Sequence, residues 1–311
     1  MKKTQAAVND FLSHCQFEKN LNPKTLKAYR TDLIQFLNFI SANNYPDILD
    51  KLDKDILKCY LKWLAQFKPK TVKRKIAALR VFLNEMELEE AILINPLRKI
   101  RIRIKEPQLL PTVMNTYEIG KILSAVWKAK KSSQFDKKIY FQLVRNVAVI
   151  ELLFATGIRV SELCNLRIDQ IDLKTGTVKI YGKGNKERMV QVCNRETLES
   201  LNEYYTIFKD KIVAKQFFFI NRISRRLSED SVRLMVRKIV VETGLSKKIT
   251  PHTFRHSFAT LLLEESVDIK YIQHLLGHSS ITTTQIYTHV NMDKTKKILS
   301  MKHPREQFHF V

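Results

Sequence analysis

The sequence predicts a mainly α-helical protein with two domains, the second of which also carries a small antiparallel β-sheet. Its 311 residues exceed what a single hydrophobic core commonly supports, so two domains are expected. Apolar residues recur at helical spacing along most of the chain. Residues 171–193 instead alternate apolar and polar side chains between glycine-containing turns, which is typical of strands.

Residues 1–102 have the pattern of a helical domain. Asn22 and Pro23 form a helix start, a capping side chain followed by proline at the first helical position. Apolar residues then recur at helical spacing up to residue 40, and residues 54–67 and 71–86 repeat the pattern. The sequence therefore predicts helices and little else before residue 102.

Four basic residues crowd the beginning of the last of these helices: Lys70, Lys73, Arg74 and Lys75. A run of charge is usually only a solvated face. Cations are mildly unfavourable at a helix N-terminus, however, because that end of the helix dipole is positive. A phosphate partner would explain their position better, so we interpret these four residues as candidate DNA contacts.

Residues 95–111, NPLRKIRIRIKEPQLLP, combine three prolines with alternating basic residues, which favours an extended linker that could lie along DNA. We expect a first domain at 1–102, a linker at 103–114 and a second domain at 115–311. In the second domain, helices are expected on both sides of 171–193, where turns at Thr175-Gly176 and Gly184-Asn185 would connect the strands.

The composition bounds the class of partner. Lysine and arginine outnumber aspartate and glutamate by 54 to 31, a formal net charge of +23. Nucleic acid is the expected partner and an anionic membrane surface the alternative. No secretory signal is visible, and the longest apolar run, at 147–155, is too short to cross a membrane. The four scattered cysteines indicate buried thiols in a reducing cytoplasm.

Six residues of the second domain are ordinary one by one but informative together. They are Arg159 in ATGIRVSEL, Lys183 at the hairpin tip GKGNKER, His252 and Arg255 three apart on one helix, His278 in LLGHSS, and Tyr287 on the helix that follows. Taken singly, each is better explained as an exposed charge or a core aromatic. His256, beside Arg255, is interpreted as structural.

Together the six residues meet the needs of displacement at a phosphodiester. Two arginines can hold the non-bridging oxygens on which charge builds up. Histidine and lysine can move the protons of a phenol nucleophile and a departing 5′ oxygen, and the phenol of Tyr287 can form a covalent 3′-phosphotyrosyl link. Because the sequence shows no carboxylate cluster of metal-binding spacing and no Walker loop, no metal and no other cofactor is expected.

The motifs ATGIRVSEL, GKGNKER, HTFRH and LLGHSSITTTQIYTH, in this order, resemble those of the tyrosine recombinase (lambda integrase) family over the whole chain. The Xer group, with HPRE at 303–306, is the nearest likeness. The resemblance implies a four-helix-type DNA-binding domain and a catalytic domain that clamp one half-site. The roles it implies are phosphate binding for Arg159 and Arg255, support from Glu162, acid for Lys183, base or phosphate ligand for His252, phosphate donor for His278 and nucleophile for Tyr287.

The family pattern also implies a homotetramer or heterotetramer on double-stranded DNA with specific half-sites, with or without a second recombinase, at the nucleoid in the cytoplasm. Residues 294–311 would pack onto a neighbouring subunit. The stretch 127–146 is longer than its Xer counterpart and lacks a GxRD motif, so dimer resolution and mobile-element integration or excision are both expected. A non-catalytic DNA-binding accessory protein and a type IB topoisomerase-like enzyme are the alternatives.

Overall fold

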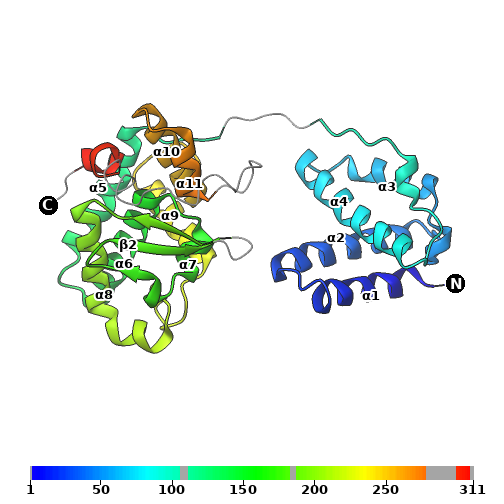
Figure 1. Cartoon of the computed structure of the whole chain (residues 1–311), viewed down its shortest axis with the longest axis horizontal. Coiled ribbons are helices and arrows are strands. Elements are labelled where there is room, and N and C mark those ends of the chain that lie inside the picture. The colour runs from blue at the N-terminus through cyan, green and yellow to red at the C-terminus, as the bar shows by residue number, and fades with distance from the viewer. Residues whose placement is uncertain (1, 106–110, 183–186, 278–298, 309–311) are drawn as a thin grey trace. The chain divides into compact units, whose positions relative to one another are not determined.

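The computed structural model describes residues 2–105, 111–182, 187–277 and 299–308. It forms two compact units, Met1–Leu109 and Leu110–Val311 (Figure 1). The described residues are mainly helical and include a small antiparallel sheet, which confirms the predicted fold class.

The helices of the N-terminal unit begin at capping side chains and prolines that can be recognised in the sequence. Asn22 accepts a hydrogen bond from the backbone N–H of Lys24, and Asp53 accepts two such bonds at the start of α3, so both side chains cap helices. Proline occupies the first turn of α2 and of α4. The described elements are α1 (Thr4–Phe17), α2 (Pro23–Ala42), η1 (Leu49–Lys51), α3 (Lys54–Leu64), α4 (Pro69–Leu88) and η2 (Pro96–Lys99).

Aromatic side chains form the centre of this unit. The rings of Phe36 and Tyr60 lie 4.8 Å apart, and those of Phe11 and Phe82 lie 5.5 Å apart, both pairs edge to face. Each of these rings is buried, and together they join α1, α2, α3 and α4 into one core.

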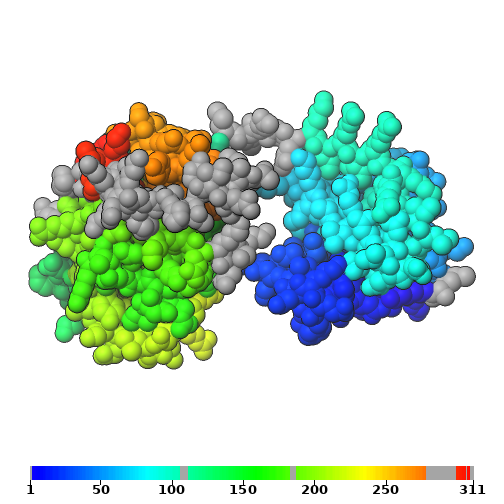
Figure 2. Space-filling view, viewed as in Figure 1, coloured from blue at the N-terminus to red at the C-terminus, as the bar shows by residue number. Residues whose placement is uncertain are grey.

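A strap of residues 100–105 follows η2 and lies against this core. Ile100, Ile102 and Ile104 pack on the core, whereas Arg101, Arg103 and Lys105 are exposed. In Figure 2 the side chains of this segment project from the surface of the N-terminal unit. The period of two is that of an extended chain with one apolar face. Ile104, inside the expected extended linker 103–114, therefore packs on the N-terminal unit.

The C-terminal unit is organised around one buried helix, α6, which packs against α5, α8 and α10 (Figure 1). Its elements are α5 (Thr116–Ser132), α6 (Lys137–Thr156), α7 (Val160–Asn165), η3 (Ile168–Gln170), β1 (Ile171–Asp172), β2 (Thr177–Tyr181), β3 (Glu187–Gln191), α8 (Arg195–Lys215), α9 (Glu229–Glu242), α10 (Pro251–Glu264), α11 (Ile269–Leu276) and η4 (Pro304–Gln307). By length and composition α6 could span a membrane, but 67% of its most apolar window is buried in the unit. It is a core helix.

The described strands pair in the order β1-β2-β3, each antiparallel to the next. Gly176, with φ +71°, stands in the first predicted turn, where a left-handed backbone favours glycine. The β2–β3 ladder runs as far as the pair Tyr181 and Glu187. The second predicted turn, at Gly184-Asn185, lies outside the described residues.

Part of the C-terminal segment, residues 294–311, which is expected to pack onto a neighbouring subunit, lies among the described residues. Its described part, residues 299–308, packs on its own chain: Leu299 joins a cluster with α10 and α11, and Phe308 packs against Phe154. His303 and Arg305 are buried. Arg305 holds the segment in place through two carboxylates of its own chain, those of Glu151 and Glu196.

Two of the four cysteines match the expectation of buried thiols. Cys15 and Cys164 are buried. Cys193 is partly exposed and Cys59 is exposed, so the expectation that all four thiols are buried is wrong for these two.

Candidate active site

Arg159 lies at a sharp junction between α6 and α7. Gly157 ends α6 with φ +58°, and a Cβ there would stand 2.6 Å from the ring of Phe258, so the position requires glycine. Arg159 then occupies the N-cap position of α7. The carboxylate of Glu162 accepts hydrogen bonds from the Arg159 backbone N–H at 2.8 Å and from its Nη1 at 2.9 Å. Glu162 thereby fixes the orientation of Arg159 through both its backbone N–H and its guanidinium.

Arg188 is a member of this cluster that the sequence analysis missed. It lies on β3 and is 8% exposed. Its Nη1 and Nη2 donate to the two oxygens of Glu162 at 2.9 and 2.7 Å, a bidentate pair, and its Nε donates to the carbonyl of Leu275 at 2.9 Å. The signal in the sequence was the arginine at the end of GKGNKER, from which only Lys183 was chosen.

The charge of Glu162 is stabilised by these neighbours. Burial by itself would raise the pKa of the Glu162 carboxyl, but the hydrogen bonds and charge of Arg188, together with those of Arg159, outweigh burial and hold the pKa below its ordinary value. Glu162 therefore stays ionised near neutral pH as the shared acceptor of two arginines.

Arg255 comes to the same junction from α10. Its Nη1 donates to the carbonyl of Gly157 at 2.8 Å and its Nη2 donates to the carbonyl of Leu276 at 2.5 Å. Burial, and next the neighbouring charge of Arg159, lower the pKa of Arg255 to about 10. A guanidinium with that pKa remains charged at neutral pH, so the site holds two neighbouring cations that repel each other and are close to one carboxylate, that of Glu162.

His252 opens the same helix. Thr250 caps α10 and Pro251 stands in its first turn, which leaves His252 exposed one turn before Arg255. Partial burial lowers the pKa of His252, and the nearby charges of His256 and Arg233 lower it further. At neutral pH its imidazole is therefore mostly uncharged and can accept a proton or a hydrogen bond. His256, interpreted as structural, is exposed.

Arg159, Glu162 and Arg255 thus lie together, and the backbone carbonyls of Gly157 and of the end of α11 accept hydrogen bonds from the two arginines. Arg159 also donates from Nη2 to the carbonyl of Gly277 at 3.2 Å. Lys183, His278 and Tyr287 lie outside the described residues. In the sequence, Lys183 falls between the paired residues of β2 and β3, and His278 directly follows Gly277.

The four candidate DNA contacts of α4 divide into two kinds. Lys70, Lys73 and Arg74 are exposed, although Arg74 forms an ion pair with Asp32. Lys75 is 4% exposed, and its ammonium donates to Asp32 at 2.9 Å and to Gln35. The expectation of a DNA contact does not suit Lys75, because the fold has already given its charge a buried partner.

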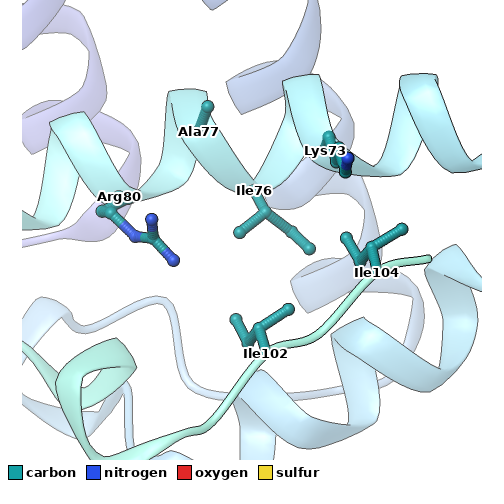
Figure 3. A pocket seen from close by; sticks show the side chains of 6 residues that line it. All are labelled: Lys73, Ile76, Ala77, Arg80, Ile102 and Ile104. Atoms are coloured by element: carbon teal, nitrogen blue, oxygen red, sulfur yellow. The ribbon is translucent and has the colours of Figure 1, made fainter. Parts of the chain in front are cut away.

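A small hollow lies between α4 and the strap. It is lined by Lys73, Ile76, Ala77, Arg80, Ile102 and Ile104. Figure 3 shows the three isoleucines gathered between the two segments, with Lys73 and Arg80 on either side of Ile76. The hollow is thus apolar at its centre and cationic at its edges.

Comparison with protein families places the chain. Residues 112–294 match the Phage integrase family, and residues 8–90 match the Phage integrase N-terminal SAM-like domain. The chain therefore belongs to the phage integrase family, and it is a tyrosine recombinase, an enzyme that transfers DNA strands. This confirms the resemblance inferred from the sequence motifs.

Curated relatives and solved structures agree with this placement. A tyrosine recombinase of Agathobacter rectalis is 45% identical over 313 aligned residues that cover 100% of both chains. Tyrosine recombinase XerC of Thermodesulfovibrio yellowstonii is 36% identical, over 98% of each chain. The XerH recombinase bound to difH substrate, a pre-cleavage complex, aligns with a TM-score of 0.67 and 25% identity, over 92% of this chain and 83% of that one. A lambda integrase tetramer bound to a Holliday junction shares the fold, with a TM-score of 0.67 and 19% identity over 91% and 79%.

Proposed function

We propose that this recombinase cleaves one DNA strand at a time through attack by Tyr287 on the scissile phosphate. The observation that carries the proposal is the convergence of Arg159 and Arg255 on one junction, both charged and both held by carbonyls or by Glu162. Such preorganised cations stabilise charge that develops on non-bridging oxygens without rearranging during the reaction. A phosphodiester adds negative charge to a site whose cations share the one carboxylate of Glu162.

The remaining roles follow from the chemistry of the step. The phenol oxygen of Tyr287 bonds to phosphorus and the bond to the 5′ oxygen breaks, leaving a 3′-phosphotyrosyl link. His252, uncharged at neutral pH, receives the phenol proton or binds a phosphate oxygen. Lys183 gives a proton to the 5′ oxygen, and His278 donates a hydrogen bond to the phosphate. Reversal of these steps by another strand's 5′ hydroxyl rejoins the DNA without ATP.

A nicked suicide substrate tests this proposal, because loss of the cleaved fragment traps the covalent intermediate. The wild-type protein should form a protein–DNA adduct in the presence of EDTA and without nucleotide. Tyr287→Phe should bind the half-site with unchanged affinity and form no adduct. A wild-type protein that binds its site yet forms no adduct would support the accessory-protein alternative. Relaxation of plasmids that lack the site would support the topoisomerase-like alternative.

We further propose that residues 1–102, together with the attached strap, form the DNA-binding domain and that residues 115–311 form the catalytic domain. The DNA-binding domain contacts the half-site through exposed cations. Lys70, Lys73 and Arg74 of α4 stand at the start of this surface. The exposed arginines of the strap and Arg80 extend it. Lys75 serves the helix packing beneath it.

The assembly we propose is a tetramer on two DNA sites, in the cytoplasm at the nucleoid. Lambda integrase, which shares the fold, forms a tetramer bound to a Holliday junction, and XerH binds its difH substrate in a pre-cleavage complex. The biological task is either resolution of chromosome or plasmid dimers or movement of a mobile element. The stretch 127–146, which lacks the Xer GxRD motif, forms the end of α5 and the first half of α6, joined at residues 133–136. Mapping covalent adducts across the genome separates the tasks: adducts at one chromosomal site indicate dimer resolution, and adducts at element ends indicate mobility.

A further inference from the structure

We propose that Arg188 is a positioning residue for strand cleavage: by neutralising Glu162 it keeps the positive charge of Arg159 available for the scissile phosphate. The inference rests on the proposed function and deepens it. Arg188 is not one of the six residues proposed to perform the chemistry. Its three guanidinium nitrogens donate to Glu162 and to the carbonyl of Leu275.

The contacts of Arg188 connect three separate parts of the site. Its guanidinium forms two hydrogen bonds with Glu162 of α7 and one with the carbonyl of Leu275 near the end of α11. A Cβ on Gly277 would stand 3.1 Å from Arg188 Cδ and Nη1, so Arg188 lies directly against the residue that precedes His278. Its own strand, β3, is paired with β2, and Lys183 lies between these two strands in the sequence. One buried side chain thus joins the segments that carry three of the proposed catalytic groups.

The charge balance explains why Arg188 matters for Arg159. Arg159, Arg188 and Arg255 face the single carboxylate of Glu162, so these four side chains carry two positive charges in excess. Without Arg188 the excess falls to one, and the Glu162 carboxylate, buried and left with Arg159 alone, competes with the phosphate for that arginine. The cost would appear in the transition state, where the negative charge on the non-bridging oxygens is greatest.

Arg188→Met tests the inference, because methionine fills similar space without charge or donors. Under single-turnover conditions on the suicide substrate, we expect Arg188→Met to keep half-site affinity within about threefold while its cleavage rate falls at least about 100-fold, as on removal of one transition-state donor. Arg188→Lys, which keeps the charge and at least one donor, should recover part of the rate. It also serves as the test if the methionine variant does not fold.

A neutral scissile group gives a readout that a purely structural role would not move. A methylphosphonate at the scissile position lacks the charge that Arg159 neutralises. Arg188→Met and Arg159→Ala should therefore both lose much less rate on the methylphosphonate than on the phosphodiester, relative to wild type. If Arg188→Met is equally impaired on both substrates, or cleaves the phosphodiester at the wild-type rate, the inference is overturned.

Arg305→Met is the matched structural control. Arg305 is another buried arginine of this unit with a bidentate carboxylate partner, but its partner is Glu151 of α6. The comparison is made at a temperature where circular dichroism shows both Arg188→Met and Arg305→Met folded. There, the ratio of the Arg305→Met cleavage rate to the wild-type rate should be the same on the phosphodiester and the methylphosphonate. A wild-type protein that forms no adduct contradicts the proposed function itself, which distinguishes the two failures.

Discussion

Arg305 and Glu151 form a two-pronged ion pair inside the catalytic domain: Nε and Nη2 of the arginine donate to the carboxylate at 2.7 and 2.9 Å, and neither side chain is exposed to solvent. The same carboxylate accepts from Trp127 at 2.7 Å and from Thr197 at 2.9 Å. This network joins the C-terminal segment to α5, α6 and α8 of its own chain.

Removing one partner of this pair should destabilise the domain. Arg305→Met leaves the Glu151 charge buried and partly uncompensated, and we expect the free energy of unfolding to fall by about 3–5 kcal/mol. Urea denaturation followed by circular dichroism measures it. The double variant Arg305→Met/Glu151→Leu should lose less than the two single variants combined, because the Glu151 charge is then no longer stranded and only Glu196 loses its arginine partner. A loss below about 1 kcal/mol in Arg305→Met would contradict the network's structural role.

His303 should make stability depend on pH. Burial lowers its pKa to about 4, and its ring is arranged for the neutral form: Nε2 faces the carbonyl of Ala155 at 2.8 Å, and Nδ1 accepts from the Arg305 backbone N–H at 2.9 Å. Between pH 4 and 6.5 the unfolded state binds a proton that the folded state does not. Stability from this group is therefore complete above about pH 6.5 and falls as the pH is lowered towards 4.

The size of this effect can be measured by comparison with a variant. From pH 7.5 to pH 5, wild type should lose about 2 kcal/mol that His303→Gln does not lose, since glutamine does not titrate. The other titratable groups, histidines and carboxylates, titrate equally in both proteins, so the difference between the two pH profiles of the free energy of unfolding isolates His303. Parallel pH profiles for the two proteins would show that His303 is not buried in its neutral form.

The exposed and buried lysines of α4 should differ in salt dependence. If Lys73 neutralises one phosphate, Lys73→Gln should reduce the slope of log affinity against log salt by about 0.9. Lys75→Met should leave that slope unchanged and lower thermal stability instead, because it strands part of the Asp32 charge. Fluorescence anisotropy on a labelled half-site at several salt concentrations gives the slopes. A reduced slope for Lys75→Met would show that Lys75 contacts DNA after all.

Gly277 should be sensitive to a single methyl group for two reasons. Its φ of +63° strains any L-residue, by about 1–2 kcal/mol, and its added Cβ would press on the Arg188 guanidinium. Gly244 is the matched control, because its φ is +66° and nothing lies within 4 Å of its Cβ position. We expect similar thermal destabilisation for Gly277→Ala and Gly244→Ala, but slower suicide cleavage only for Gly277→Ala. Equal cleavage rates for Gly277→Ala and Gly244→Ala would mean that displacing the Arg188 guanidinium does not affect cleavage.

Much of the fold could be read from local patterns. Asn22-Pro23 begins α2 and Thr250-Pro251 begins α10, as expected from their capping chemistry, and the alternating stretch after residue 171 contains the described strands. These features depend on residues within a turn or two of each other, so sequence spacing is enough to predict them. The strap was recognised as extended, but its attachment to the core depended on which face the isoleucines met.

The sequence by itself determined the fold class and the kinds of catalytic groups, because periodicity, caps and motif order are local properties. Only the tertiary structure decided the state of each charge. Lys75 is buried because Asp32, 43 positions away, lies beside it; Arg188 belongs to the site because Glu162, 26 positions away, accepts its donors; Arg305 anchors the C-terminal segment on Glu151, 154 positions away. A cation can serve DNA or the core, and the choice depends on whether folding brings a carboxylate within hydrogen-bonding distance.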